Sequence, residues 1–228
     1  MTSARSPARR KKTDHRTRVG RDRRARTRQK ILEAALGVFA GKGPDAPVID
    51  DFIKAAGVAR GTFYNYFKTT GELLTATSKW LEDELMVAIE AGIAGLDDPV
   101  ERLATGLRLW LHQSRNDAVF CAFVVRNQYR GQLVERRLDK DLGEGLRSGQ
   151  FAAPSMQVAR DLVVGAAREA QARMMNGRVA RSYPDDVACI VLRGLRVNER
   201  ELERLLAAPL PQIERRAQTR EGLPRAVQ

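Results

Sequence analysis

Histidine and cysteine are scarce in this sequence, with two residues of each among 228. Cys121 and Cys189 lie far apart, each within an apolar run, which predicts two buried, reduced thiols and no disulfide or catalytic pair. His15 lies in a basic tail and His112 in an expected helix, so they predict no metal cluster or catalytic dyad. We therefore expect no metal and no cofactor, and an enzyme is the disfavoured function class.

Long hydrophobic runs are also missing. The sequence contains no stretch of about 18 apolar residues, so we expect no membrane span. Its basic N-terminus is not followed by the apolar segment that a secretory signal requires. Apolar residues at 43% and charged residues at 30% are typical of a globular protein, and we expect it in the cytoplasm.

Positive charge is concentrated at the N-terminus. Residues 1–28 contain twelve Arg and Lys and two Asp, a net charge of +10 against +12 for the whole chain. This composition predicts a disordered, basic arm over residues 1–25. The arm either serves only as a solvated segment or adds salt-sensitive affinity for nucleic acid. An anionic membrane is a weaker alternative, because the arm lacks the apolar face of an interfacial helix.

Helical periodicity dominates the rest of the chain. Apolar residues recur at spacings of three and four, and no segment alternates with period two for long. The sequence therefore predicts an all-α fold of about nine helices. Start and stop signals place these helices at about 26–40, 49–56, 60–67, 70–91, from 99 onwards, 117–129, 133–146, 156–176 and 185–207. A polar tail is expected over 209–228.

Two of the short helices form a helix-turn-helix pattern. Gly57 stands where the chain must turn sharply between the segments 49–56 and 60–67. Apolar side chains fall where a three-helix unit needs core contacts, at Phe52, Ala56, Val58, Phe63 and Phe67. We therefore expect a small N-terminal unit with its own core.

Aromatic residues make up only 6% of the chain, yet four of them fall within positions 63–67. Helical phase divides this cluster. Phe63 and Phe67 are four residues apart and share the core side, whereas Arg60, Tyr64 and Lys68 form a second row. Arg and Asn side chains can read base edges, while a Tyr hydroxyl and a Lys can hold phosphates. The second row therefore predicts a DNA-contacting surface, and the alternative is an ordinary solvated face.

The segments "TRQKILEAALGVFAGKG", "AAGVARGTFYNYF" and "GELL" resemble the tetracycline-repressor (TetR) family of transcriptional regulators over Thr27 to Leu74. Beyond Leu74, only the helical layout and the "LGEGLRSGQF" ending are similar. The resemblance implies a helix-turn-helix DNA-binding domain over 26–70 and a helical effector-binding and dimerisation domain over 71–208. It also implies a homodimer that responds to a small-molecule effector of unknown identity.

Individual positions carry the implied DNA contacts. Positions matching the major-groove contacts are Arg60, Thr62, Asn65 and Tyr66, those matching phosphate contacts are Gly61, Tyr64 and Lys68, and a further backbone-contact region corresponds to Thr27 and Arg28.

Several positions depart from the family pattern. Val48 and Ala59 stand where a capping Ser or Thr is usual, and each missing cap costs about 1 kcal/mol of local stability. Ile53 replaces a small residue where the two short helices cross, and Asp50 adds an acid near the expected DNA side. Thr70 and Gly71 replace a usual Lys–acid pair.

The C-terminal helices offer candidates for ligand contacts. Aromatic and polar side chains that could line an effector cavity are Trp110, His112, Phe120, Phe123, Arg126 and Met174. The alternative is that the apolar members belong to an ordinary core.

The last two expected helices carry small residues among apolar ones. Helices at about 156–176 and 185–206 would form a four-helix dimer interface with their copies, or they would only complete the monomer core. We favour the dimer, because one recognition helix reads too few bases for specificity and because the resembled family is dimeric. Together with the resemblance, the sequence thus implies a ligand-responsive regulator, expected to act as a repressor at a pseudo-palindromic DNA operator. The alternative is a nucleoid-like or interaction module that binds DNA without sequence choice.

Overall fold

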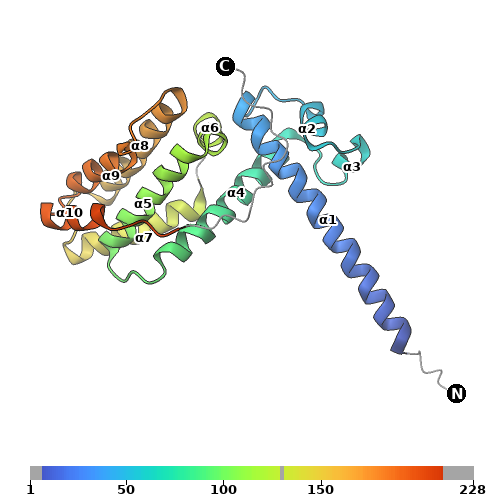
Figure 1. The fold of residues 1–228 in the computed structure, drawn as a ribbon, viewed down its shortest axis with the longest axis horizontal. Helices are drawn as coiled ribbons and strands as arrows, with labels where there is room; N and C mark the ends of the chain where they lie inside the picture. The colour runs from blue at the N-terminus through green and yellow to red at the C-terminus, as the bar shows by residue number, and fades with distance from the viewer. Residues whose placement is uncertain (1–6, 129–130, 213–228) are drawn as a thin grey trace.

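The computed structural model describes residues 7–128 and 131–212. Within these residues the chain forms ten α-helices and no strand, which confirms the all-α prediction (Figure 1). The helices are α1 (Pro7–Lys42), α2 (Ile49–Ala56), α3 (Arg60–Tyr64), α4 (Thr70–Ile93), α5 (Pro99–Asn116), α6 (Ala118–Arg126), α7 (Gln132–Ser148), α8 (Met156–Asn176), α9 (Tyr183–Gly194) and α10 (Glu199–Ala207). None of the described helices is both long and apolar enough to cross a membrane.

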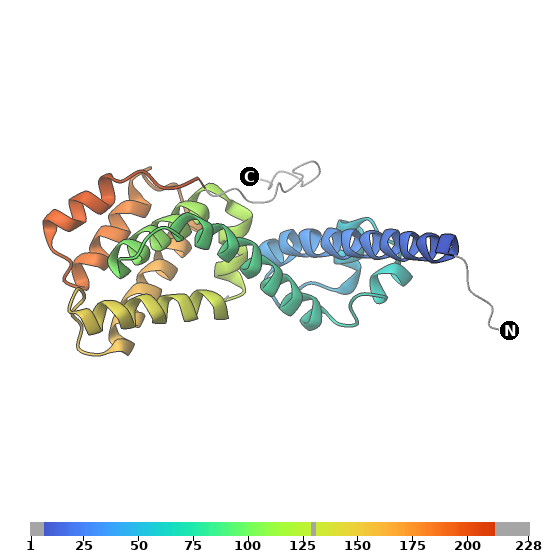
Figure 2. The same cartoon turned by 90° about the horizontal axis from the view of Figure 1, so that it is seen from below.

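The first helix differs from the prediction of a disordered arm. α1 begins at Pro7, so residues 7–25 continue the expected helix from Arg26 towards the N-terminus, while residues 1–6 lie outside the described residues. Proline suits the first position of a helix, and the Ala, Arg and Lys residues that follow have high helix propensity. The N-terminal part of α1 projects beyond the other helices (Figures 1 and 2).

The last expected helix is two helices. The prediction of one helix over 185–207 is wrong, because the chain turns between Gly194 and Asn198. Arg196 adopts a left-handed conformation with φ of 63°, and its backbone N–H donates to the carbonyl of Arg193 at 2.9 Å. The Asn198 side chain then accepts a hydrogen bond from the backbone N–H of Glu201 at 2.9 Å and starts α10.

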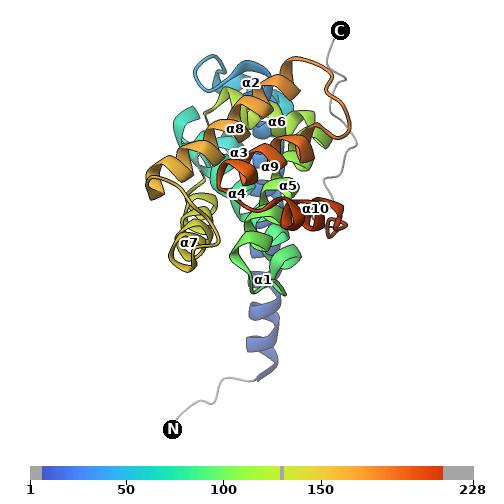
Figure 3. The same ribbon diagram turned by 90° about the vertical axis from the view of Figure 1, so that its left-hand side faces the viewer.

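The helices enclose two hydrophobic clusters. The first, here called the N-terminal core, joins α1–α4 to α6, with Phe39 and Phe52 in ring contact at 4.8 Å and Phe39 and Phe123 at 6.4 Å. The second, the C-terminal core, is formed by α5 and α7–α10. α5 packs against α7, α8 and α9, and Figure 3 shows it among these helices.

Two helices connect these clusters. α6 packs against both α1 and α8, and α4 packs against α1, α5 and α7. The structure therefore gives a continuous path of packed helices from the helix-turn-helix to the C-terminal bundle. The exact boundary expected between residues 70 and 71 stays a prediction.

Candidate nucleic-acid interface and ligand cavity

The turn between α2 and α3 has the predicted geometry. Gly57 adopts the left-handed conformation with φ of 57° and ψ of 45°, and the backbone N–H of Val58 donates to the carbonyl of Ile53 at 3.3 Å. Phe52, Phe63 and Phe67 are buried in the N-terminal core beside Ala56. The structure thus confirms the core that holds the second short helix in place.

That second helix is shorter than expected. α3 ends at Tyr64, whereas the sequence predicted a helix to about Phe67. Helix-like hydrogen bonds nevertheless continue, because the backbone N–H groups of Tyr66 and Phe67 both donate to the carbonyl of Phe63, at 2.9 and 3.1 Å. The tightened turn therefore keeps residues 65–67 wound as an extension of α3.

The predicted DNA-contacting residues of α3 and its extension fall into two groups. Exposed positions are Arg60, Gly61, Asn65 and Lys68, and half-buried positions are Thr62, Tyr64 and Tyr66. Tyr66 packs against the N-terminal core, and the Arg24 guanidinium lies 5.9 Å from its ring centroid. The Lys68 ammonium donates to the carbonyl of Tyr64. The structure thus brings a basic, polar surface together around α3, with Tyr66 as part of its support.

Residues of α1 lie beside this surface. The Arg28 guanidinium is 5.7 Å from the Phe67 ring centroid, and the Thr27 hydroxyl donates to the carbonyl of Arg23 at 3.0 Å. Such cation–π contacts are worth about 0.5–1 kcal/mol at exposed sites. They hold the arginine-rich part of α1 against the turn that follows α3.

An acid of α2 contacts the recognition surface. Asp50 Oδ1 accepts a hydrogen bond from Arg60 Nη2 at 2.5 Å, and both side chains are 62% exposed. The ion pair satisfies the guanidinium in the absence of DNA. Asp50 is thus the departure from the family pattern that touches a predicted DNA contact directly.

The two helices of the helix-turn-helix lack the usual side-chain N-caps. Val48 and Ala59 cap α2 and α3 without side-chain hydrogen bonds. At α2, however, Asp51 compensates, since its carboxylate accepts from the backbone N–H of Val48 at 3.0 Å and from Lys42 Nζ at 2.7 Å. The Lys42 hydrogen bond, followed by that from Val48, lowers the pKa of Asp51.

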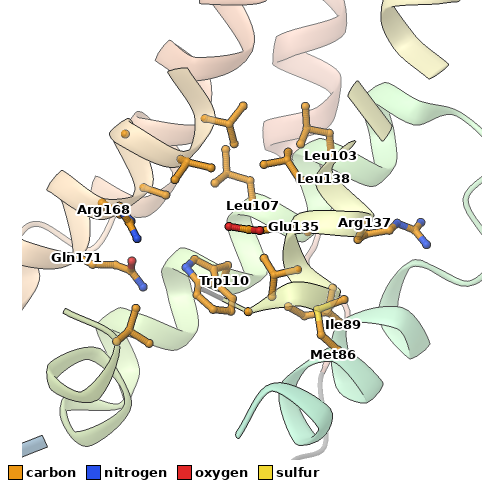
Figure 4. A pocket seen from close by; sticks show the side chains of 18 of the residues that line it. Met86, Ile89, Leu103, Leu107, Trp110, Glu135, Arg137, Leu138, Arg168 and Gln171 are labelled. Carbon is orange, nitrogen blue, oxygen red and sulfur yellow. The ribbon is translucent and has the colours of Figure 1, made fainter. Parts of the chain in front are cut away.

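A cavity of about 480 Å³ lies between α4 and α8 in the C-terminal bundle (Figure 4). Its wall is mainly apolar, with contributions from every helix between α4 and α8. Apolar lining residues include Met86, Ile89, Leu103, Leu107, Trp110 and Leu138. Small-molecule sites typically have volumes of about 300–1,000 Å³, so this cavity is large enough for a ligand.

Ion pairs form one part of this wall. Arg102 is buried, and its Nε donates to Asp141 Oδ1 at 2.8 Å, while its Nη2 contacts Glu144. Arg137 donates to the other oxygen of Asp141 at 3.0 Å and pairs with Glu90 at 2.9 Å. Burial alone lowers the pKa of Arg102, but the carboxylates of Asp141 and Glu144 outweigh this and raise it, so the group stays charged.

Of the six predicted ligand contacts, Trp110 lines this cavity. Phe120 and Phe123 are fully buried in the N-terminal core, and Met174 packs against the C-terminal core. His112 Nε2 lies 3.1 Å from Asp185 Oδ2, and Arg126 Nη1 donates to the carbonyl of Gly41 at 2.6 Å. These five side chains lie outside the cavity lining, and each has a structural contact of its own.

Sequence reasoning passed over other lining residues, among them Gly106, Arg168 and Gln171. Arg168 and Gln171 are three residues apart on α8, so they share a helix face. Gln171 is only 1% exposed, and its Nε2 donates to Ser114 Oγ on α5 at 2.8 Å. The sequence signal that could have identified them is a pair of polar side chains on one helix face whose other residues are small or apolar.

Comparison with known proteins supports the family resemblance found in the sequence. Residues 31–77 match the family model described as bacterial regulatory proteins, tetR family. The HTH-type transcriptional regulator CymR of Pseudomonas putida is 31% identical over 150 residues, which cover 55% of this chain and 74% of that protein. A protein of Escherichia coli K12 described as the probable acrEF/envCD operon repressor is 26% identical over 175 residues, covering 74% of this chain and 72% of that protein.

The match covers different shares of the first relatives. It spans 74% of CymR but 36% of YvdT, an uncharacterised HTH-type regulator of Bacillus subtilis. Among solved structures, that of RolR in complex with resorcinol superposes with a TM-score of 0.62 at 25% identity, covering 85% of this chain and 99% of RolR.

Proposed function

This chain belongs to the tetR family of bacterial regulatory proteins, and we propose that it is a ligand-responsive repressor that binds a pseudo-palindromic operator as a homodimer. The observation that carries the proposal is the exposed, basic surface of α3 mounted on the buried rings of Phe63 and Phe67. Repression is supported by the repressor named among the relatives, and a ligand response by the solved complex of RolR with resorcinol.

The proposed DNA contacts divide by chemistry. Arg60 and Asn65 are exposed and carry the side chains best suited to base edges, with Thr62 and Tyr66 beside them. Phosphate contacts are assigned to Gly61, Tyr64 and Lys68, together with Thr27 and Arg28 of α1. The arginines of α1 add a salt-dependent attraction that does not depend on sequence.

The proposed dimer uses α8 and α9. Two large apolar side chains are exposed there, Val158 at 49% and Ile190 at 62%. The two helices approach closely, since a Cβ at Gly194 would lie 2.8 Å from Leu162. When this surface pairs with its copy in a second chain, its apolar side chains become buried. The pairing also positions the two α3 helices to enter successive major grooves of the DNA. The segment expected to pair, residues 185–206, also includes most of α10, which is a separate helix.

α4 is the proposed link between ligand and DNA. It contributes Met86 and Ile89 to the cavity wall, while Leu73 and Leu81 of the same helix are buried in the N-terminal core with α1. A ligand that favours one position of α4 would change the spacing of the two recognition helices. Occupancy then shifts the population away from the DNA-binding conformer. We place this regulator in the cytoplasm, where its operator lies.

A footprint on the intergenic DNA next to the chain's own gene tests the function. We expect protection of two half-sites about one helical turn apart that survives competitor DNA. The double variant Arg60→Ala/Tyr64→Ala should lose this protection, whereas Lys140→Ala/Arg147→Ala, which removes two exposed charges from α7, should retain it. DNA binding that leaves no defined footprint and is lost when salt is added would instead favour the nucleoid-like alternative.

A further inference from the structure

The cavity between α4 and α8 holds an unequal set of charges. Most of its charged lining residues have ion-pair partners within the protein. Arg102 and Arg137 share Asp141, as described above, and Glu135 accepts from Arg160 at 3.1 Å. Glu169 pairs with Arg173 at 3.6 Å. These charges are therefore already compensated before any ligand enters.

Arg168 is the exception. In the described part of the chain, no carboxylate, carbonyl or hydroxyl accepts a hydrogen bond from its guanidinium, although it lines the cavity. Figure 4 shows Arg168 and Gln171 on one side of the cavity, with Leu103 and Leu138 on the other. The Arg168 side chain is half-buried, and within the described residues no carboxylate balances its charge, as usually happens for a charge next to apolar surface.

Trp110 adds a second donor on the same side. Its indole nitrogen points towards Gln171 and Arg168 in Figure 4, and within the described residues nothing accepts a hydrogen bond from it. Hydrogen bonds connect α5 and α8 next to these two donors. Ser114 Oγ donates to the Trp110 carbonyl at 3.0 Å and accepts from Gln171 Nε2 at 2.8 Å. Two donors thus remain available where α5 and α8 meet.

We propose that the effector is a small amphipathic carboxylate whose charged end binds Arg168, with Trp110 as a second donor. Its hydrophobic body fills the apolar side of the cavity. A guanidinium binds a carboxylate through two parallel hydrogen bonds, and such charge-assisted bonds are strong when water is excluded. The inference rests on the proposed function only in taking this cavity as the effector site.

Titration calorimetry on the full chain, without DNA, tests the ligand class. Matched probes that differ in charge are 2-naphthoate, 2-naphthamide and 2-naphthylmethylammonium, and decanoate with decanamide provides a flexible scaffold. We expect at least one carboxylate to bind more tightly than its amide. Arg168→Gln should weaken that carboxylate by about 10–100-fold and leave the affinity of the amide nearly unchanged.

The amide and a second variant separate charge recognition from damage to the fold. Arg200→Gln removes an exposed charge from α10, outside the cavity lining, and should leave carboxylate affinity unchanged. Equal binding of acid and amide, preference for the ammonium probe, equal weakening of acid and amide by Arg168→Gln, or binding of neither carboxylate would each overturn the inference. Because the assay contains no DNA, these outcomes are independent of whether the operator footprint is found.

Discussion

Arg60 of α3 and Asp50 of α2 form an ion pair across the helix-turn-helix, with Nη2 and Oδ1 2.5 Å apart. Both side chains are 62% exposed, and exposed pairs of this kind contribute about 0–1 kcal/mol to stability. The pair therefore matters little for folding. Its consequence is for DNA, because the arginine that we propose reads a base must first leave Asp50, and the carboxylate repels nearby phosphates.

Asp50→Asn should therefore strengthen operator binding. Removing the charge frees Arg60 and removes a repulsion, and we expect the Kd for the footprinted duplex to fall by about threefold to tenfold. Fluorescence anisotropy at two salt concentrations measures this, and the unfolding midpoint should stay nearly unchanged. Asp83→Asn, the same charge change at an exposed position of α4, is the control. An unchanged or higher Kd for Asp50→Asn would show that the pair does not oppose DNA binding.

Local signals predicted the helix-turn-helix well. The αL turn at Gly57, the burial of Phe63 and the start of α5 after Asp98 each depend on residues close in sequence. Thr69 caps α4 in the same local way, since its hydroxyl accepts from Glu72 N at 3.0 Å and the Glu72 carboxylate accepts from Lys68 N at 2.8 Å. Such short-range geometry is set by backbone conformation and side-chain reach.

Partners distant in sequence could not be predicted in the same way. Arg108 reaches Asp185, 77 residues away, and Arg102 reaches Asp141, 39 residues away, because the bundle folds α5 against α7 and α9. No periodicity specifies which helices become neighbours. For the same reason Arg168 was overlooked, since its importance depends on which other charges of the cavity are already paired.

Ile190→Glu should convert the proposed dimer to a monomer. Ile190 is 62% exposed on α9, and a carboxylate there would be buried without a partner in the proposed interface. Sedimentation velocity at micromolar concentration should show half the mass of the unmodified protein. Val87→Glu places the same charge at a 71% exposed apolar position of α4 and should leave the dimer intact. A dimeric Ile190→Glu protein would move the interface away from α9.

Asp185→Asn should destabilise the protein at neutral pH. Asp185 Oδ1 accepts from the buried Arg108 Nε at 2.7 Å, and Arg108 also donates to the carbonyls of Leu205 in α10 and of Ala208 directly after it. Loss of the carboxylate leaves that guanidinium without its counter-charge, which we expect to cost about 1–3 kcal/mol in urea unfolding at pH 7. Asp186→Asn removes an exposed charge from the same helix turn and should cost little.

The cost of Asp185→Asn should also depend on pH. Burial raises the pKa of Asp185, but the hydrogen bonds from Arg108 and His112 outweigh it, so its pKa lies below the ordinary value. A lowered pKa in the folded state means that the ionised carboxylate stabilises the fold above about pH 4 and stops doing so as pH falls through the lowered pKa. The difference between the two proteins should therefore shrink below about pH 4, and a constant difference would contradict this origin.

Gly145→Ala should destabilise the turn that follows α7. A Cβ at Gly145 would overlap the buried ring of Phe151, whose backbone N–H donates to the Gly145 carbonyl at 3.0 Å. Shifting the ring should cost about 1–3 kcal/mol, seen as a lower melting temperature. Gly143→Ala lies on the same helix with no atom within 4 Å of the added carbon, so it should be neutral or stabilising. Equal effects of the two changes would show that Phe151 yields at no cost.

Gly106→Leu should separate ligand response from DNA binding. Gly106 lies within α5 and lines the cavity, and an added Cβ would meet no heavy atom within 4 Å. A leucine there would occupy space that the ligand needs while improving helix propensity by about 1 kcal/mol. We expect lost ligand binding in calorimetry, an unchanged operator footprint and a melting temperature that does not fall. Gly106→Ala, which adds a single methyl group, should keep most of the ligand affinity. A leucine variant that binds ligand normally would show that the effector does not occupy the space beside Gly106.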